Sequence, residues 1–420
     1  MEKEKIQSGI NPGKTERRIN VLFFTFLLAG VMAVTLVLFY RQCVGSMSGS
    51  GLYHSDMKAY ILKMQGLDSG YQFPYPVLFK LAALFHLFAS PELSMALATM
   101  FLNSLAVCIT KLVMDHLVYE DLKSQLGRLG WGAGPVISLL SVGLFFISML
   151  YPPAGIYLPG IRYNYLGVFT ANPFHNATYM AARPFAVLAF YWFVKLLDRY
   201  ETETFREGNW WKDYLLFSVF LLLATMAKPS FTIVLAGAAG LIMVYRFFLA
   251  KGKNLVPTLI LGMTFVPTFL DLLYQFRGVF VPKEGVEGGI GFCLGSIWGL
   301  YCENLPLSIL LAVGFPLLVL LFHRKEFRKD TLYRFSWQLY LMGFAMAFFL
   351  YEKGFRAPDF NFSWGYMYGI FFAFLGAVYI LMKSPGKNKL VRILQWAAFG
   401  AHLLCGLVYF GGIFAGRMYY

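Results

Sequence analysis

Long apolar runs alternate with short polar segments along almost the whole chain. An α-helix needs about 20 apolar residues to cross the ~30 Å hydrocarbon core of a bilayer, and the run from Val21 to Tyr40 is the first of many that are long enough. A membrane β-barrel would show shorter segments of alternating polarity instead. The pattern therefore predicts an all-α, polytopic transmembrane helical bundle of about eleven spans, near residues 21–40, 94–114, 133–151, 178–197, 213–227, 231–249, 256–274, 306–322, 334–351, 362–382 and 394–415.

Two shorter segments after the first span are predicted to be interfacial helices. Val77 to Phe88 is apolar but too short to span, so we expect it to lie in the membrane interface. Met57 to Gln65 follows Ser55 and Asp56, whose side chains can accept hydrogen bonds from the free amides of a first helical turn. Counting Val77 to Phe88 as a crossing would invert the side of every later loop.

The basic residues predict the topology. The chain has 36 Lys and Arg against 22 Asp and Glu, a net charge of +14, and loops rich in Lys and Arg remain cytoplasmic. Eleven spans after a cytoplasmic N-terminal tail, residues 1–20, put the basic segments inside and Tyr420 outside. Residues 21–420 then form a single multi-pass transmembrane domain with outer loops 41–93, 152–177, 275–305 and 352–361. The charge is explained by topology and contact with anionic membrane lipids, and no motif indicates a nucleic acid partner.

The composition agrees with a membrane protein, since 58% of residues are hydrophobic and only 14% are charged. The first span lacks a clear small-residue cleavage site, so we expect it to remain as an anchor. Short loops and the lack of a retention signal favour the plasma membrane of a bacterium. Of five cysteines, only Cys293 and Cys302 share an outer loop, where a disulfide and two thiols are both compatible with the sequence.

The strongest chemical signal is the polar cluster Tyr53-His54-Ser55-Asp56, just after the first span. Asp56 is either a helix cap or a general base that takes a proton from an acceptor hydroxyl near the outer leaflet. His54 could bind phosphate or share the proton, and Lys58 adds a cation on the other side. A carboxylate and an imidazole beside a bilayer favour chemistry at the membrane surface.

A second polar run, which contains Asn172, His175 and Asn176, enters another apolar span. Arg183 lies one or two turns inside that span, where a guanidinium needs a partner such as a lipid phosphate. The plainer alternatives are an ordinary loop histidine for His175 and a snorkelling anchor for Arg183. Asn176-Ala177-Thr178 also fits the N-glycosylation pattern.

Four further charged residues fall on outer loops or span ends. Lys228 lies at the outer end of a tight helical hairpin, Arg277 in a Gly-rich loop, and Glu352 and Arg356 in the last outer loop. Snorkelling and solvated loop charges would explain all four without any function. The sequence has no HExxH, no paired CxxC, no Gly-rich phosphate loop and no serine elbow. No metal site is therefore predicted, and the cofactor is left open: a divalent metal is not indicated.

This arrangement resembles the GT-C class of multi-pass glycosyltransferases, which use polyprenyl-phosphate sugars. Members have an acidic residue in the first outer loop and interfacial helices in the same loop. Asp56 matches the acid, and Met57 to Gln65 and Val77 to Phe88 match the helices. Many members carry paired acids, whereas here the single acid stands between His54 and Lys58.

The resemblance implies an inverting transfer from a polyprenyl-phosphate sugar to a hydroxyl of a glycan, lipid or protein acceptor at the outer face. Asp56 would be the general base. The leaving phosphate gains negative charge, so it needs cationic donors, for which the candidates are Arg183, Lys228, His175 and Arg277.

Two other classes stay open. A transporter or flippase for a lipid-linked or anionic substrate predicts charges within spans, and Asp271 is the nearest acid of that kind. An outer-face polysaccharide polymerase or ligase predicts Arg and His in a large loop of the second half. The loop 275–305 offers Arg277 but no histidine.

Overall fold

The computed structural model describes residues 13–151, 161, 169–205, 208–279 and 288–417, and these are almost entirely helical. The predicted all-α, polytopic class is confirmed, with the addition of one small antiparallel sheet among the described residues. The α-helices are α1 (Lys14–Ser48), α2 (Met57–Met64), α3 (Val77–Phe85), α4 (Pro91–Leu126), α5 (Ala133–Phe146), α6 (Ala177–Arg199), α7 (Trp211–Ala227), α8 (Ser230–Leu249), α9 (Leu255–Met263), α10 (Val266–Val279), α11 (Ser296–Gly299), α12 (Leu305–Phe322), α13 (Arg324–Lys329), α14 (Thr331–Phe349), α15 (Ser363–Lys383) and α16 (Lys389–Phe414). The 3-10 helices are η1 (Gly127–Gly132) and η2 (Gly354–Asp359), and the strands are β1 (Ile290–Phe292) and β2 (Leu350–Glu352).

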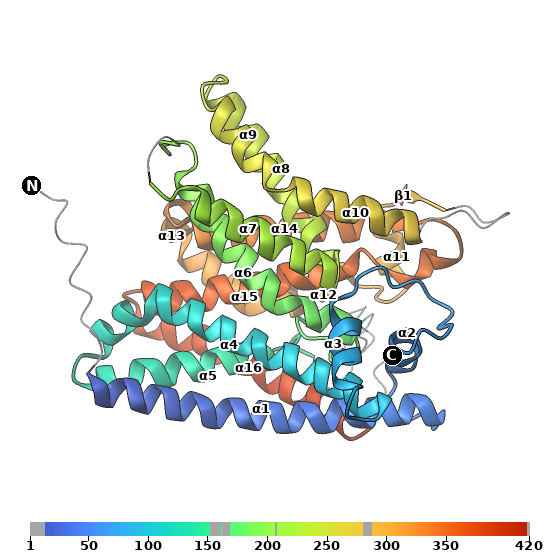
Figure 1. Ribbon diagram of the computed structural model, residues 1–420. Helices are drawn as coiled ribbons and strands as arrows, with labels where there is room; N and C mark the ends of the chain where they lie inside the picture. The colour runs from blue at the N-terminus through green and yellow to red at the C-terminus, as the bar shows by residue number, and fades with distance from the viewer. Residues whose placement is uncertain (1–12, 152–160, 162–168, 206–207, 280–287, 418–420) are drawn as a thin grey trace, which may run out of the picture.

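The long helices lie side by side along one common direction (Figure 1). Ten of the predicted apolar runs each lie on one helix, although 133–151 is helical only as far as Phe146 and 334–351 only as far as Phe349, and the run 256–274 is divided between α9 and α10. By length and composition, seven helical segments of the described chain can cross a membrane, counting Pro91–Phe146 as one. The number is eight if α9 and α10, which meet at 46°, form one broken span. The chain is thus a multi-pass membrane protein.

Helix α1 is longer than the predicted first span at both ends. It starts at Lys14, inside the predicted tail, and continues to Ser48, inside the predicted outer loop. The polar residues that flank the apolar run are compatible with a helix, so hydrogen bonding continues past the edge of the hydrocarbon. The helix stops where Gly49 takes the left-handed conformation, with φ 67°, that commonly ends helices.

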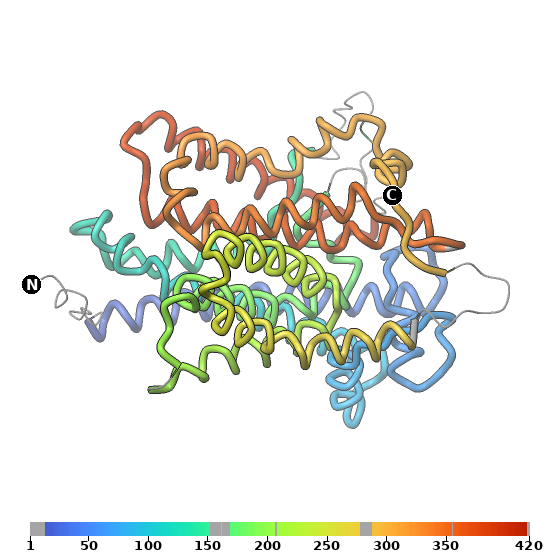
Figure 2. The backbone as a smooth tube through the Cα atoms, turned by 90° about the horizontal axis from the view of Figure 1, so that it is seen from above, coloured from blue at the N-terminus to red at the C-terminus, as the bar shows by residue number. Residues whose placement is uncertain are grey.

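Helix α15 forms the centre of the bundle, and α14, α8, α12 and α4 pack around it (Figure 2). All but the two residues Trp364 and Lys383 of α15 are buried. Glycines allow the closest approach to α14: a Cβ added at Gly343 would lie 2.9 Å from the Gly365 carbonyl oxygen, and one at Gly369 would lie 2.8 Å from a Cα of α14. Such small-residue contacts are the usual means of close helix packing in membranes.

A buried histidine of α16 compensates for a kink in α12. Val313 leaves the helical conformation, with φ −128°, and this frees backbone groups on either side. The Leu311 carbonyl accepts the backbone N–H of Leu150 at 2.8 Å, and the Phe315 N–H donates to Nε2 of His402 at 3.2 Å. The kink is therefore satisfied by tertiary hydrogen bonds, as buried backbone groups require.

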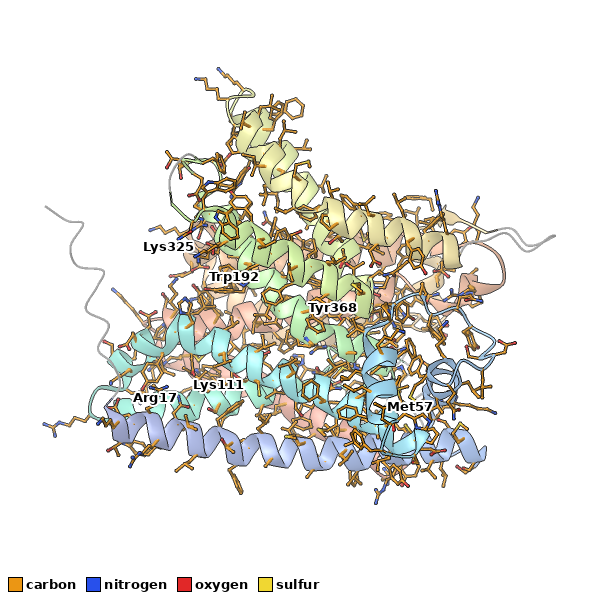
Figure 3. The ribbon with its side chains drawn as sticks, viewed as in Figure 1. Arg17, Met57, Lys111, Trp192, Lys325 and Tyr368 are labelled. Atoms are coloured by element: carbon orange, nitrogen blue, oxygen red, sulfur yellow. The ribbon has the colours of Figure 1, made fainter. Side chains whose placement is uncertain are left out.

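The bundle has two chemically different ends, which we call the α2 end and the α13 end. In Figure 3, Arg17 and Lys325 lie at the α13 end and Met57 lies at the α2 end. Helix α3 runs across the direction of the long helices at the α2 end (Figure 1), and β1, β2 and η2 lie at the same end. The described parts of the segments that the sequence predicts to be outer loops therefore lie at the α2 end.

Candidate functional site

Asp56 stands at the start of α2, next to Met57, but does not cap the helix. It occupies the N-cap position, and its side chain makes no capping hydrogen bond. Its Oδ2 atom instead accepts from the Tyr60 hydroxyl at 3.1 Å and from Nδ2 of Asn176 at 2.8 Å. Oδ1 accepts no hydrogen bond from the described part of the chain, and the residue is exposed. The carboxylate is thus held by one oxygen and open at the other.

Asn176 links the polar segment before α6 to the segment around Asp56, which the sequence presented as two separate candidates. It is the N-cap of α6, and its Oδ1 accepts the backbone N–H of Tyr179 at 2.9 Å. The same oxygen accepts from Nζ of Lys228 at 3.0 Å and from the Thr178 hydroxyl at 2.9 Å. Because three donors fix Oδ1, Nδ2 is directed at Asp56. This amide is buried, and both its oxygen and its nitrogen are hydrogen-bonded, so it is not available as a glycosylation acceptor.

Lys228 lies in the break between α7 and α8. Its own backbone is extended, as is usual for the residue before a proline, here Pro229. Its ammonium also donates to the Thr178 hydroxyl at 3.2 Å and lies 4.4 Å from the ring centre of Trp364. The side chain is only 7% exposed, and burial lowers its pKa to about 7, while the charge of Asp56 acts in the opposite direction. Lys228 therefore gains or loses its proton near neutral pH.

The sequence did not identify three residues of this site, which are Tyr60, Thr178 and Trp364. The Tyr60 hydroxyl lies 3.2 Å from Thr178 Oγ1 as well as contacting Asp56, and Trp364 lies under the lysine. Tyr60 is four residues after Asp56, a spacing that places both side chains on one helix face and could have identified it. Trp364 carries no signal that separates it from other aromatic residues of a span. We call Asp56, Tyr60, Asn176, Thr178 and Lys228 the Asp56 cluster.

Arg183 is buried away from the Asp56 cluster, where it braces the backbone. It is 2% exposed. Its guanidinium donates to Oδ1 of Asn172 at 2.6 Å and to the backbone carbonyl of Ala171, and the centre of the Phe371 ring lies 4.0 Å away. Nδ2 of Asn172 donates to the carbonyls of Leu144 and Ile147 at the end of α5. These contacts satisfy terminal carbonyls of a helix and fix the segment that leads to the N-cap of α6.

The last outer loop is linked to the Asp56 cluster by a series of contacts. Nε of Arg356 lies 3.3 Å from Oε2 of Glu352 and 3.2 Å from Oδ2 of Asp359. Glu352 also accepts from Nδ2 of Asn361 at 2.9 Å, and Oδ1 of Asn361 accepts from the Trp364 indole at 3.3 Å. Since the same indole ring lies beside the lysine ammonium, Glu352 and Arg356 border the cluster.

The other predicted residues differ in how close they lie. His54 and Lys58 are exposed near the carboxylate. His175 is buried, with its ring centre 6.1 Å from that of Trp364, and burial lowers its pKa to about 3. It is therefore neutral at physiological pH and brings no positive charge to a phosphate. Arg277 is exposed on the last turn of α10, and no hydrogen bond or ion pair of the described residues joins it to the cluster.

The electrostatics of the cluster favour a carboxylate with an oriented proton donor beside it. Desolvation by the surrounding protein raises the pKa of the Asp56 carboxyl, while the charge of Lys228 and then the hydrogen bond from Tyr60 lower it. Because the residue is exposed, water reaches the carboxylate and limits this rise. Burial raises the pKa of Tyr60 well above its ordinary value, so its hydroxyl keeps its proton and donates to Asp56.

The two outer-loop cysteines carry thiols with separate partners: Sγ of Cys293 donates to the Phe348 carbonyl and Sγ of Cys302 to the Asn304 carbonyl. Among the described residues, no three His, Cys, Asp or Glu side chains are grouped closely enough to hold a metal ion. No protein-family model matches the chain, and no curated protein is significantly similar to it.

Proposed function

We propose that this protein is an inverting glycosyltransferase of the GT-C type. It transfers a sugar from a polyprenyl-phosphate donor to a hydroxyl of a glycan, lipid or protein acceptor at the outer face of the plasma membrane. The observation that carries the proposal is the half-open carboxylate of Asp56, held on Oδ2 by Asn176 and Tyr60 at one end of a membrane bundle.

Asp56 has the features of a general base. The free Oδ1 can accept the proton of an acceptor hydroxyl, while the two hydrogen bonds to Oδ2 fix the orientation of the carboxylate. The acceptor oxygen then forms a bond to the anomeric carbon, the bond from that carbon to the phosphate oxygen breaks, and polyprenyl phosphate leaves with the electron pair. Attack from the face opposite the phosphate inverts the anomeric centre.

Lys228 and Arg356 are the best-placed cations for the leaving phosphate. The charge of Arg356 is close enough to lower the pKa of Lys228, whose ammonium lies over the Trp364 ring, and Arg356 is linked to the same indole through Glu352 and Asn361. A bound phosphate would act in the opposite direction and raise that pKa, so donor binding would keep the lysine charged. Arg183 is committed to the backbone brace and His175 is neutral, which removes two of the four cations suggested by the sequence.

The proposed topology has eleven crossings, with the α2 end outside and the α13 end in the cytoplasm. This count treats α7 and α14 as crossings, takes α9 and α10 together as one broken span, and separates α4 from α5, which pack against each other. The four basic residues of α13 then face the cytoplasm, together with Arg17 at the same end, as the positive-inside rule requires.

The decisive experiment compares the envelope glycans and glycolipids of source cells that lack the protein with those of cells that re-express it. Wild type, Asp56→Asn and the control Asp68→Asn are expressed at matched membrane levels. Asp68 is exposed in the same outer segment, and within the described residues its side chain accepts only the Gly70 N–H. We expect wild type and Asp68→Asn to restore a sugar-bearing species, and Asp56→Asn to leave the lipid-linked sugar untransferred. Full restoration by Asp56→Asn would refute the proposal.

A transporter is the second candidate, because the buried Lys111 forms an ion pair with the half-buried Asp115 inside α4. Charges within a span are expensive and commonly serve substrate or ion pathways. The same cells decide between the two functions. If Lys111→Met abolishes the phenotype, Asp56→Asn preserves it, and the lipid-linked sugar accumulates on the cytoplasmic side, transport replaces sugar transfer.

A further inference from the structure

A groove opens at the α13 end, across the membrane from the Asp56 cluster. It has a volume of about 420 Å³ and lies between the end of α8, the start of α14 and Glu201, which is two residues beyond the end of α6. Helix α8 begins two residues after Lys228 and α6 begins directly after Asn176, so the opposite ends of these helices, which form the groove, are remote from the cluster. Its lining includes Glu201, Tyr245, Arg246, Leu249, Arg334 and Gln338.

Two guanidinium groups line this groove, and both are anchored by the backbone. Nη1 of Arg246 donates to the Leu197 carbonyl at 2.7 Å and lies 3.3 Å from a Glu201 oxygen. Nη1 of Arg334 donates to the Arg328 carbonyl at 2.8 Å, and its Nη2 donates to the Thr331 hydroxyl at 3.0 Å. Each guanidinium has five N–H donors, so these bonds orient the group and leave donors for a ligand. The groove is thus lined by prealigned cations.

The charge of the groove favours an anion. Two arginines and one glutamate line it, and that glutamate, Glu201, is already satisfied by Arg246 and by Nδ2 of Asn254 at 2.6 Å. Contact with Arg328 connects the groove to α13, whose other cations are Arg324, Lys325 and Lys329. A planar guanidinium pair with further positive charge nearby matches the oxygens of a phosphate group.

The same groove has an apolar wall that faces outward. Tyr245 is 66% exposed and Leu249 is 69% exposed, and both belong to the last turns of α8, next to Arg246. Exposed apolar side chains at the end of a membrane helix contact acyl chains, whereas a soluble anion would gain nothing from them. We propose that the groove between α8 and α14 binds one anionic phospholipid, with its phosphate on Arg246 and Arg334 and its acyl chains along Tyr245 and Leu249.

The test uses the purified full-length protein with phosphatidylglycerol or phosphatidylcholine of the same acyl chains. Native mass spectrometry counts the retained lipids, and an apparent melting temperature is recorded in each lipid. The variants are Arg334→Gln and the double variant Arg246→Gln with Arg334→Gln. Lys212→Gln is the matched control, because Lys212 is exposed at the start of α7, at the same end of the bundle.

We expect wild type and Lys212→Gln to retain one phosphatidylglycerol in preference to phosphatidylcholine. Loss of a charge-assisted hydrogen bond should weaken that retention about tenfold in Arg334→Gln, and the double variant should lose the preference. If the double variant does not fold, retention of phosphatidylglycerol by Arg334→Gln alone still tests the proposal. Equal retention of phosphatidylglycerol by wild type and Arg334→Gln would overturn it. Stabilisation of the wild type by inorganic phosphate to the same extent as by phosphatidylglycerol would also overturn it, in favour of a site for free anions.

Discussion

Replacing Lys228 by methionine should make the protein more stable at acidic and neutral pH. Methionine keeps most of the length of the side chain but removes an ammonium that is 7% exposed. It also removes the hydrogen bonds to Asn176 and Thr178, a loss of about 1 to 3 kcal/mol that does not depend on the pH of the solution. The pH dependence of the difference between variant and wild type therefore isolates the charge.

The size of the effect follows from the pKa of Lys228, which burial lowers from its ordinary value of 10.5 to about 7. Between these values the folded protein binds fewer protons than the unfolded chain, so the stability of wild type rises with pH across this window. One pH unit corresponds to about 1.4 kcal/mol, so the charged lysine costs the fold about 5 kcal/mol below pH 7 and nothing above pH 10.5. The advantage of Lys228→Met should be largest below pH 7 and should shrink steadily above it.

The assay is the apparent melting temperature of the purified protein in one detergent, measured from pH 6 to pH 10 for wild type and Lys228→Met. Lys353→Met serves as the control, because Lys353 is an exposed lysine at the same end of the bundle. We expect the melting temperature of Lys228→Met to exceed that of wild type by several degrees at pH 6, with the gap closing towards pH 10. A gap that stays constant over the whole range would show that the buried ammonium does not titrate as the geometry requires.

Two further substitutions test the packing and the Asp56 cluster. Gly406→Ala should lower the free energy of unfolding by about 1 to 3 kcal/mol or more, because a Cβ there would lie 1.7 Å from the Phe146 carbonyl oxygen. The control is Gly400→Ala on the same helix, where a Cβ meets open space. It should be neutral or stabilising in the same thermal unfolding measurement. Asn176→Asp keeps the capping oxygen but puts a second carboxylate where an amide lies 2.8 Å from Asp56, so the pair should share a proton with a raised pKa. As the pH rises from 5 to 8, the variant should therefore lose stability relative to wild type, and an unchanged difference would contradict the contact.

The position of individual site residues could be predicted from the sequence better than their roles. The sequence singled out Asp56, Asn176 and Lys228 because polar groups beside a bilayer are few. It also suggested that Arg183 binds phosphate, whereas the fold commits this guanidinium to a backbone carbonyl and to Asn172. A guanidinium one or two turns inside a span needs a partner in either case, and residue types do not reveal which partner is near.

The sequence by itself determined the class of this protein, because an apolar run of about 20 residues has no other stable solution than a membrane helix, and basic residues mark one end of such a bundle. Only the tertiary structure decided how the loops meet. Asp56 and Asn176 are 120 positions apart, and their contact at 2.8 Å depends on how α1, α4 and α6 pack together. Helix formation is governed by local hydrogen bonds and solvent polarity, which the sequence encodes locally. A site built from helix ends depends on side-chain packing among spans that are all apolar, so their order around the bundle cannot be deduced from composition or spacing.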